Sequence, residues 1–136
     1  MAILDWLKGR FGRPALEPLT GAPSVRRQKS YSGQSGYVYQ YFYEGQRGRA
    51  ESVEYVFSVT AGRANYFPAS VLVSAAGVRE WEARHGRELR SNERYGIAKM
   101  ALFQAFDEHP SPTAMREPVL VDALGVAAML ASLDID

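Results

Sequence analysis

The chain has 136 residues, of which 46% are hydrophobic, and it contains 16 Lys and Arg residues, 15 Asp and Glu residues and no cysteine. This length is typical of a single domain, which buries roughly two-thirds of its unfolded surface and needs no disulfide or metal to fold. The lack of cysteine excludes disulfides, thiolate metal sites and cysteine nucleophiles.

The start of the chain does not have the pattern of a secretory signal. Asp5, Lys8 and Arg10 interrupt the apolar run that such a signal requires. No segment approaches the ~20 consecutive apolar residues of a membrane-spanning helix. We therefore expect a cytoplasmic protein, a location that the lack of cysteine also fits.

Charge is distributed unevenly along the chain. Residues 1–49 contain eight Lys and Arg against three Asp and Glu, whereas residues 50–136 contain eight against twelve. The positive excess of the first part can attract an anionic partner. A solubilising tail has the same composition, and the sequence leaves both interpretations open.

Residues 3–11 have the spacing of a short amphipathic helix, with Trp6, Leu7 and Phe11 among its apolar side chains. An isolated helix of this length is marginal in water. It therefore has to dock on its own domain, on a second copy, on a partner protein or on a lipid surface. Residues 12–36 are rich in proline and glycine and have no apolar period, which predicts a linker.

Three segments then have the composition of β-strands. Residues 37–44 are rich in aromatic and β-branched side chains, and residues 52–60 alternate with the period of two that a half-buried strand requires. Residues 45–48, which begin and end with glycine, predict the turn between them. The third strand, about 65–73, contains Pro68, which has no backbone N–H. We expect this strand to lie at a sheet edge, or to be bulged, at that proline.

Helices follow in the second half of the chain. Residues 75–85 have an apolar face, with Ser74 as a plausible N-cap and Gly86 as a fitting stop. Residues 92–108 predict a longer helix, in which three alanines allow a close approach to the sheet. The last apolar run predicts a terminal helix from about 122 to 132.

Together these elements predict an α+β protein with a lead-in over residues 1–36 and a single domain over residues 37–136. The domain is expected to contain a small three-stranded antiparallel sheet, about 37–73. The helices 75–85 and 92–108 would pack on one face of this sheet. A C-terminal helix and a short N-terminal helix complete the expected fold.

The sequence contains no recognisable pattern of catalytic or metal-binding residues. The only histidines, His85 and His109, do not have the spacing of metal ligands, and His85 suits a helix C-terminus because of the helix dipole. Nothing matches a phosphate-binding loop or a nucleophile elbow. We therefore expect no metal, no cofactor and no enzymatic activity.

The alternating tyrosines are the one unusual feature. Tyr37, Tyr39, Tyr41 and Tyr43 are expected to project from one face of the first strand. Such a row can stack bases or sugars, and the neighbouring cations Arg47 and Arg49 would favour an anionic ligand. Tyrosine is also a favoured strand residue, so packing within the domain or against a second subunit explains the same row.

The helix 92–108 carries apolar residues on two sides, because Met100 and Phe103 lie opposite its main apolar stripe. The terminal helix can cover them within one chain, or a second copy can do so. A small sheet also has two edges that need protection. We therefore expect a binding or assembly domain that forms a homodimer.

Two alternative functions remain open from the sequence. One is nucleic-acid binding by the tyrosine row and the basic lead-in, although no specific motif supports it. The other is docking on a membrane or a partner protein through residues 3–11.

Overall fold

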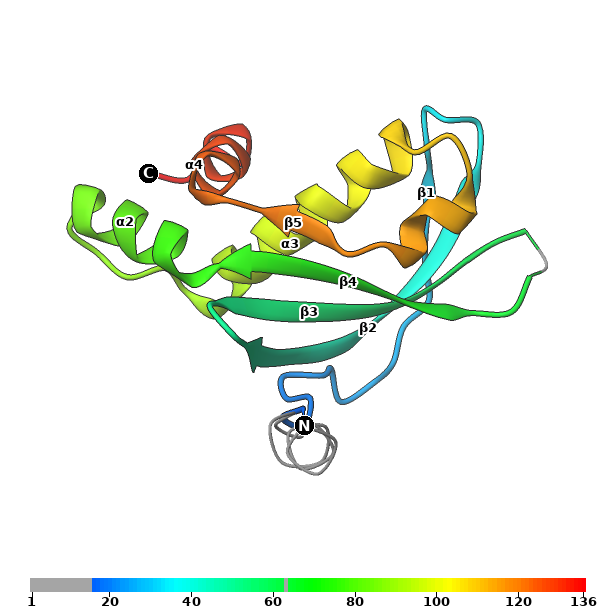
Figure 1. Cartoon of the computed structure of the whole chain (residues 1–136), viewed down its shortest axis with the longest axis horizontal. Helices are drawn as coiled ribbons and strands as arrows, with labels where there is room; N and C mark the ends of the chain where they lie inside the picture. Colours follow the sequence, from blue (N-terminus) through cyan, green and yellow to red (C-terminus); the bar gives the residue numbers. More distant parts are fainter. Residues whose placement is uncertain (1–15, 63) are drawn as a thin grey trace, which may run out of the picture.

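The computed structural model describes residues 16–62 and 64–136. Five strands, three α-helices and a short 3-10 helix make up this part of the chain (Figure 1). In chain order they are β1 (Lys29–Ser32), β2 (Val38–Arg49), β3 (Ser52–Ala61), β4 (Phe67–Ser74), α2 (Ala75–His85), α3 (Ser91–Glu108), η2 (Pro112–Arg116), β5 (Val119–Val121) and α4 (Ala123–Ser132). The expected helix over residues 3–11 lies outside the described residues.

The expectation of a small three-stranded antiparallel sheet is wrong. The five strands form one sheet in the order β1-β2-β3-β4-β5, antiparallel from β1 to β4, with β5 parallel to β4. The first added strand, Lys29–Ser32, lies in the segment that the sequence assigns to a linker. It is short and mostly polar, so its place in the sheet depends on backbone pairing with β2 rather than on an apolar pattern.

Strand β2 is longer than the sequence predicts, because residues 45–48 continue the strand instead of forming a turn. The pairing with β3 shifts at a bulge between Tyr43 and Gly45, where Gly45 has a φ of +124°. A Cβ at Gly45 would lie 2.8 Å from the carbonyl oxygen of Thr20, so only glycine lets the lead-in pair with β2 here. The bulge also reverses which side chains of β2 after Tyr43 point to the inner face of the sheet and which point to the outer face.

The α-helices lie close to their predicted positions. Ser74 caps α2 by accepting a hydrogen bond from the backbone N–H of Gly77 at 3.0 Å, and Gly86 ends this helix with a φ of +66°. Pro68 pairs only with Ser58 of β3, because β5 pairs with β4 further along, at Val71–Val73. The expected edge position of this proline is therefore confirmed.

The core lies between α3 and the inner face of the sheet. Tyr39 and Phe106 are fully buried, and their rings stack with centroids 4.0 Å apart and an angle of 9° between the ring planes. Phe57 and Leu102 are also fully buried. Small side chains of α3, such as Ala98, let this helix approach the strands closely.

The outer face of the sheet contains a buried carboxylate, that of Glu54, which is 1% exposed. It accepts hydrogen bonds from Arg47 Nε at 2.8 Å, Arg49 Nη1 at 3.2 Å and Ser70 Oγ at 2.6 Å, and so connects β2, β3 and β4. Burial by itself raises the pKa of this carboxyl. The hydrogen bonds from Ser70 and Arg47 and the two positive charges outweigh burial and lower it.

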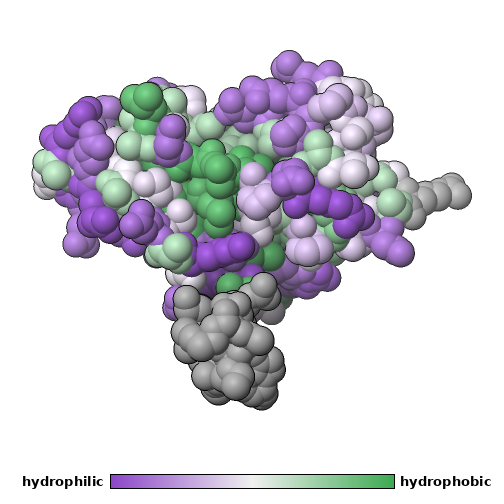
Figure 2. Space-filling view, in the orientation of Figure 1, coloured by the Kyte–Doolittle hydropathy of each residue, from purple (hydrophilic) through white to green (hydrophobic). Residues whose placement is uncertain are grey.

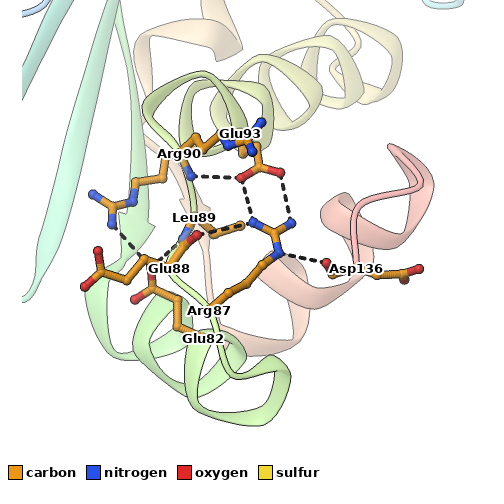
Figure 3. Close-up of polar contacts among 8 residues, drawn as sticks. Glu82, Arg87, Glu88, Leu89, Arg90, Glu93 and Asp136 are labelled. Carbon is orange, nitrogen blue, oxygen red and sulfur yellow. Dashed lines mark hydrogen bonds and ion pairs between the residues drawn. The ribbon is translucent and has the colours of Figure 1, made fainter.

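A second polar network fixes the loop between α2 and α3 (Figure 3). The Arg87 guanidinium donates to both carboxylate oxygens of Glu93 at 3.0 Å, and its Nε donates to the carbonyl oxygen of Asp136 at 2.9 Å. The backbone N–H of Arg90 also donates to Glu93, at 2.8 Å. The network therefore connects the first turn of α3 to the C-terminus of the chain.

Helices α2 and α4 meet at a contact between Gly77 and Ala123. A Cβ placed on Gly77 would lie 2.8 Å from the Cα of Ala123, closer than real Cβ contacts come. An ordinary helix position would gain stability from replacing glycine with alanine, because glycine is unfavourable in helices. At Gly77 the new Cβ would clash with the backbone of Ala123, so replacing this glycine with alanine lowers stability instead of raising it.

We expect Gly77→Ala to lower the free energy of unfolding by about 1–3 kcal/mol, as overpacked sites do. The matched control is Gly96→Ala in α3, where the new Cβ meets only the end of the Leu133 side chain, at 3.2 Å. Chemical denaturation of both variants measures the difference. A Gly77→Ala protein as stable as the Gly96→Ala protein would contradict this account of the contact.

The Glu93 carboxyl predicts a dependence of stability on pH. Hydrogen bonds from Arg87 and Arg90 lower its pKa from 4.5 to about 2. As pH falls, the unfolded chain therefore takes up this proton before the folded chain does. The stabilising contribution of Glu93 is complete above pH 4.5 and is lost as pH falls through about 2.

We expect the difference in unfolding free energy between the wild-type protein and Glu93→Gln to be constant above pH 5 and to shrink steadily below about pH 4.5. Denaturant titrations at a series of pH values measure it. Glu80→Gln, which removes an exposed pair with Arg84, is the control and should change stability by less than ~0.5 kcal/mol. A Glu93→Gln difference that does not vary between pH 6 and pH 3 would refute the assignment.

Candidate functional site

The edge of the sheet at β5 carries the most exposed large apolar side chains of the described chain. Strand β5 is the last in the sheet and pairs only with β4. Leu120 in this strand is 75% exposed, and Leu124 in the first turn of α4 is 82% exposed. We call β5 with the start of α4, residues 119–124, the edge surface.

A groove of about 540 Å³ lies beside these leucines. Its walls come from the C-terminal half of α3, from β5 and from α4, with Ala101, Ala105, Gly125, Ala128 and Met129 among the lining residues. Figure 2 shows hydrophobic surface gathered in the middle of this view, over the region of β5 and α4 in Figure 1. Glu108, His109 and Glu117 add polar side chains to the lining.

Local sequence explains why the two leucines project together. Asp122 ends β5 and caps α4, because its side chain accepts a hydrogen bond from the backbone N–H of Gly125 at 2.8 Å. Val121 and Val126, on either side of the cap, are buried and anchor the segment in the core. Leu120 and Leu124 are left on the solvent side.

The structure divides the tyrosine row. Tyr39 is fully buried and Tyr41 is 2% exposed, so their rings belong to the core. Tyr37 is 39% exposed and Tyr43 is half-buried. The hydroxyl of Tyr39 is buried without a hydrogen-bond partner among residues 16–62 and 64–136. The four side chains therefore do not form one open stacking surface.

Arg47 and Arg49 do not lie with the tyrosines. Both guanidinium groups pair with Glu54 on the outer face of the sheet, whereas Tyr39 and Tyr41 face α3. The bulge at Gly45 is the reason, because it displaces the alternation that the sequence shows. The grouping of these cations with the tyrosine row does not exist in the structure, and a role for each residue in binding stays a prediction.

The predicted interface residues fall in two places. Trp6, Leu7 and Phe11 lie outside the described residues. Met100 and Phe103 border a shallow groove between α3 and α4. Phe103 is partly covered by Tyr31 of β1, whose ring stacks on it with centroids 4.2 Å apart.

The exposed leucines were missed at the sequence level. The sequence after Pro118 contains more apolar residues than one buried face of a short helix can hold, and this excess indicated that some of them are exposed. Which residues between β5 and α4 are buried depends on where α4 begins, and Asp122 sets that start as its N-cap. Helix ends shift easily by one or two residues, so the apolar composition did not identify Leu120 and Leu124 as the exposed side chains.

Titratable groups give no sign of metal chemistry in the part of the chain that the structure describes. No group of three His, Asp or Glu side chains there could hold a metal ion. The ring of His85 stacks on Trp81 with centroids 3.9 Å apart, and its Nδ1 lies 2.9 Å from the carbonyl oxygen of the same residue. Within the same ranges no helix is long and apolar enough to cross a membrane.

The comparisons with known proteins add no family to these observations. The function has to be inferred from the exposed leucines, the groove beside them and the other features of the chain itself. No protein-family model, no curated protein and no solved structure matches this chain.

Proposed function

We propose that the protein is a non-enzymatic assembly domain that forms a homodimer through its edge surface. The observation that carries the proposal is the exposure of Leu120 and Leu124, 75% and 82%, on an edge strand. Burying a leucine side chain stabilises an interface by roughly 1.5–3 kcal/mol. Each leucine occurs twice in a two-fold dimer, so four side chains contribute.

The shape of the region favours a second copy as the partner. Two-fold dimers need one patch that is complementary to itself. Here the projecting leucines lie directly beside the apolar groove between α3 and α4, since Leu120 and Leu124 both line it. In a two-fold arrangement the leucines of each chain can enter the groove of the other.

The backbone of β5 supports the same arrangement. An edge strand presents N–H and C=O groups that no neighbouring strand uses, and these groups pair readily with another chain. Antiparallel pairing of two β5 strands would join the two sheets. Three residues give only a few such bonds, so most of the affinity must come from the leucines and the groove.

We expect the wild-type protein to be dimeric at micromolar concentration and Leu124→Glu to raise the dissociation constant of the dimer by at least ~10-fold. Leu120→Glu should have a similar effect. Size-exclusion chromatography with light scattering over a range of concentrations measures both. The new charge would have to be buried in the apolar groove of the second copy, which is why the effect is large.

The matched control is Leu16→Glu, at a leucine that is 57% exposed and outside the edge surface. It should leave the dissociation constant unchanged. The free energy of unfolding of the monomer should change by less than ~0.5 kcal/mol in all three variants, because each leucine is solvent-exposed in the single chain. A wild-type protein that stays monomeric at several hundred micromolar would disprove the proposal.

A further inference from the structure

A second pocket, of about 460 Å³, lies toward the opposite edge of the sheet from β5, between the lead-in, β2 and the start of α3. This volume is within the range of small-molecule sites, roughly 300–1,000 Å³. The lead-in contributes Pro23 and Val25, and α3 contributes Asn92 and Tyr95. We call it the tyrosine pocket, because Tyr41, Tyr43 and Tyr95 line it.

The tyrosine rings give this pocket an apolar wall with polar tips. The rings of Tyr43 and Tyr95 lie 4.7 Å apart between centroids, at an angle of 53°. Among the residues that the structure describes, none provides a hydrogen-bond partner for the hydroxyl of Tyr41, Tyr43 or Tyr95. Burial raises the pKa of all three phenols, that of Tyr41 to about 12, so they are neutral donors at ordinary pH.

Cations gather at one side of the same pocket. Arg27 and Lys29 line it, and Lys99 lies one helical turn beyond Tyr95. Burial and, after it, the positive charge of Lys29 lower the pKa of Lys99. No carboxylate within residues 16–62 or 64–136 lies at ion-pair distance from any of the three.

This arrangement of charge is unfavourable without an anion. The positive charges of Arg27 and Lys29, which both line the pocket, repel each other. Six arginines elsewhere among the described residues pair with carboxylates, for example Arg26 with Glu44 and Arg94 with Glu82. An anionic group beside Arg27 and Lys29 would convert this repulsion into attraction. The hydroxyls beside the cations would supply neutral hydrogen bonds to the same ligand.

We propose that the tyrosine pocket binds a small organic anion with a planar apolar body. Its charged group lies at Arg27 and Lys29, and its planar part lies against the rings of Tyr43 and Tyr95. A bare inorganic anion would leave the ring wall unused, and a neutral aromatic compound would leave the cations unpaired. The pocket is formed by one chain and does not depend on self-association at the edge surface.

The probe that we would use is 2-naphthoate, with 2-naphthylmethanol as its neutral relative and acetate as its ring-free relative. Backbone amide shifts of the isotope-labelled full chain report the position and strength of binding. We expect a dissociation constant of ~1 mM or lower for 2-naphthoate, as for a small ligand of this size, and binding at least ~10-fold weaker for the other two. The shift changes should be confined to residues 21–29, 41–46 and 91–99.

Separate substitutions test the contribution of the cations and the contribution of the tyrosine rings. Arg27→Gln and Lys29→Gln should each weaken 2-naphthoate binding by about tenfold, the usual loss for a hydrogen bond to a charged group, and Lys29→Arg should keep most of the affinity. Tyr43→Leu should have a similar effect through loss of the ring, whereas Tyr43→Phe should keep most of the affinity. Arg84→Gln and Tyr66→Leu, at exposed positions outside the pocket, are the controls.

Three results would overturn the inference. One is the absence of shift changes at ~10 mM 2-naphthoate, well above the expected dissociation constant. Another is equal binding of acetate or 2-naphthylmethanol, since the pocket would then recognise only a charge or only a ring. The third is unchanged affinity in folded Arg27→Gln and Lys29→Gln proteins, with folding checked by circular dichroism.

Discussion

The close packing of α3 on the inner face of the sheet is the interaction on which the rest of the structure depends. The face of α3 that contacts the sheet carries the small side chains of Ala98, Ala101 and Ala105. The helix therefore lies close enough for Phe106 to stack on Tyr39, with 4.0 Å between the ring centroids. The C-terminal end of α3 in turn holds the chain around β1. Asp107 accepts hydrogen bonds from the Tyr31 hydroxyl and from the backbone N–H of Gln34, both at 2.9 Å.

This packing has consequences at both edges of the sheet. On one side, the contacts to Asp107 place β1 beside β2, and the chain just before β1 forms a wall of the tyrosine pocket. On the other side, η2 returns the chain from α3 to β5, and the buried Met115 fixes that return. The edge surface and the tyrosine pocket are therefore separated by the width of the sheet, so occupation of one leaves the other accessible.

The sequence predicted the parts of the fold that depend on periodicity. The helices and the inner strands each bury a regular face, and Ser74 and Gly86 mark the ends of α2 by local chemistry. The sequence did not predict β1 or β5, since strands of four and three residues are too short to show a period and are held by their neighbours. It also placed Arg47 in a turn, whereas residues 45–48 continue β2 and the bulge at Gly45 puts the Arg47 side chain on the outer face of the sheet.

The short length of β5 bears on how selective the edge surface can be. A long, flat edge strand pairs with almost any extended chain and promotes aggregation, whereas three residues offer too few backbone bonds to do so alone. Binding at this edge therefore requires side-chain contacts, and those depend on a partner that fills the groove and covers Leu120 and Leu124. Glu117 and Asp122, both exposed next to these leucines, border the apolar surface with negative charge. In the proposed dimer, apolar complementarity would select the partner, and the backbone of β5 would contribute orientation more than affinity.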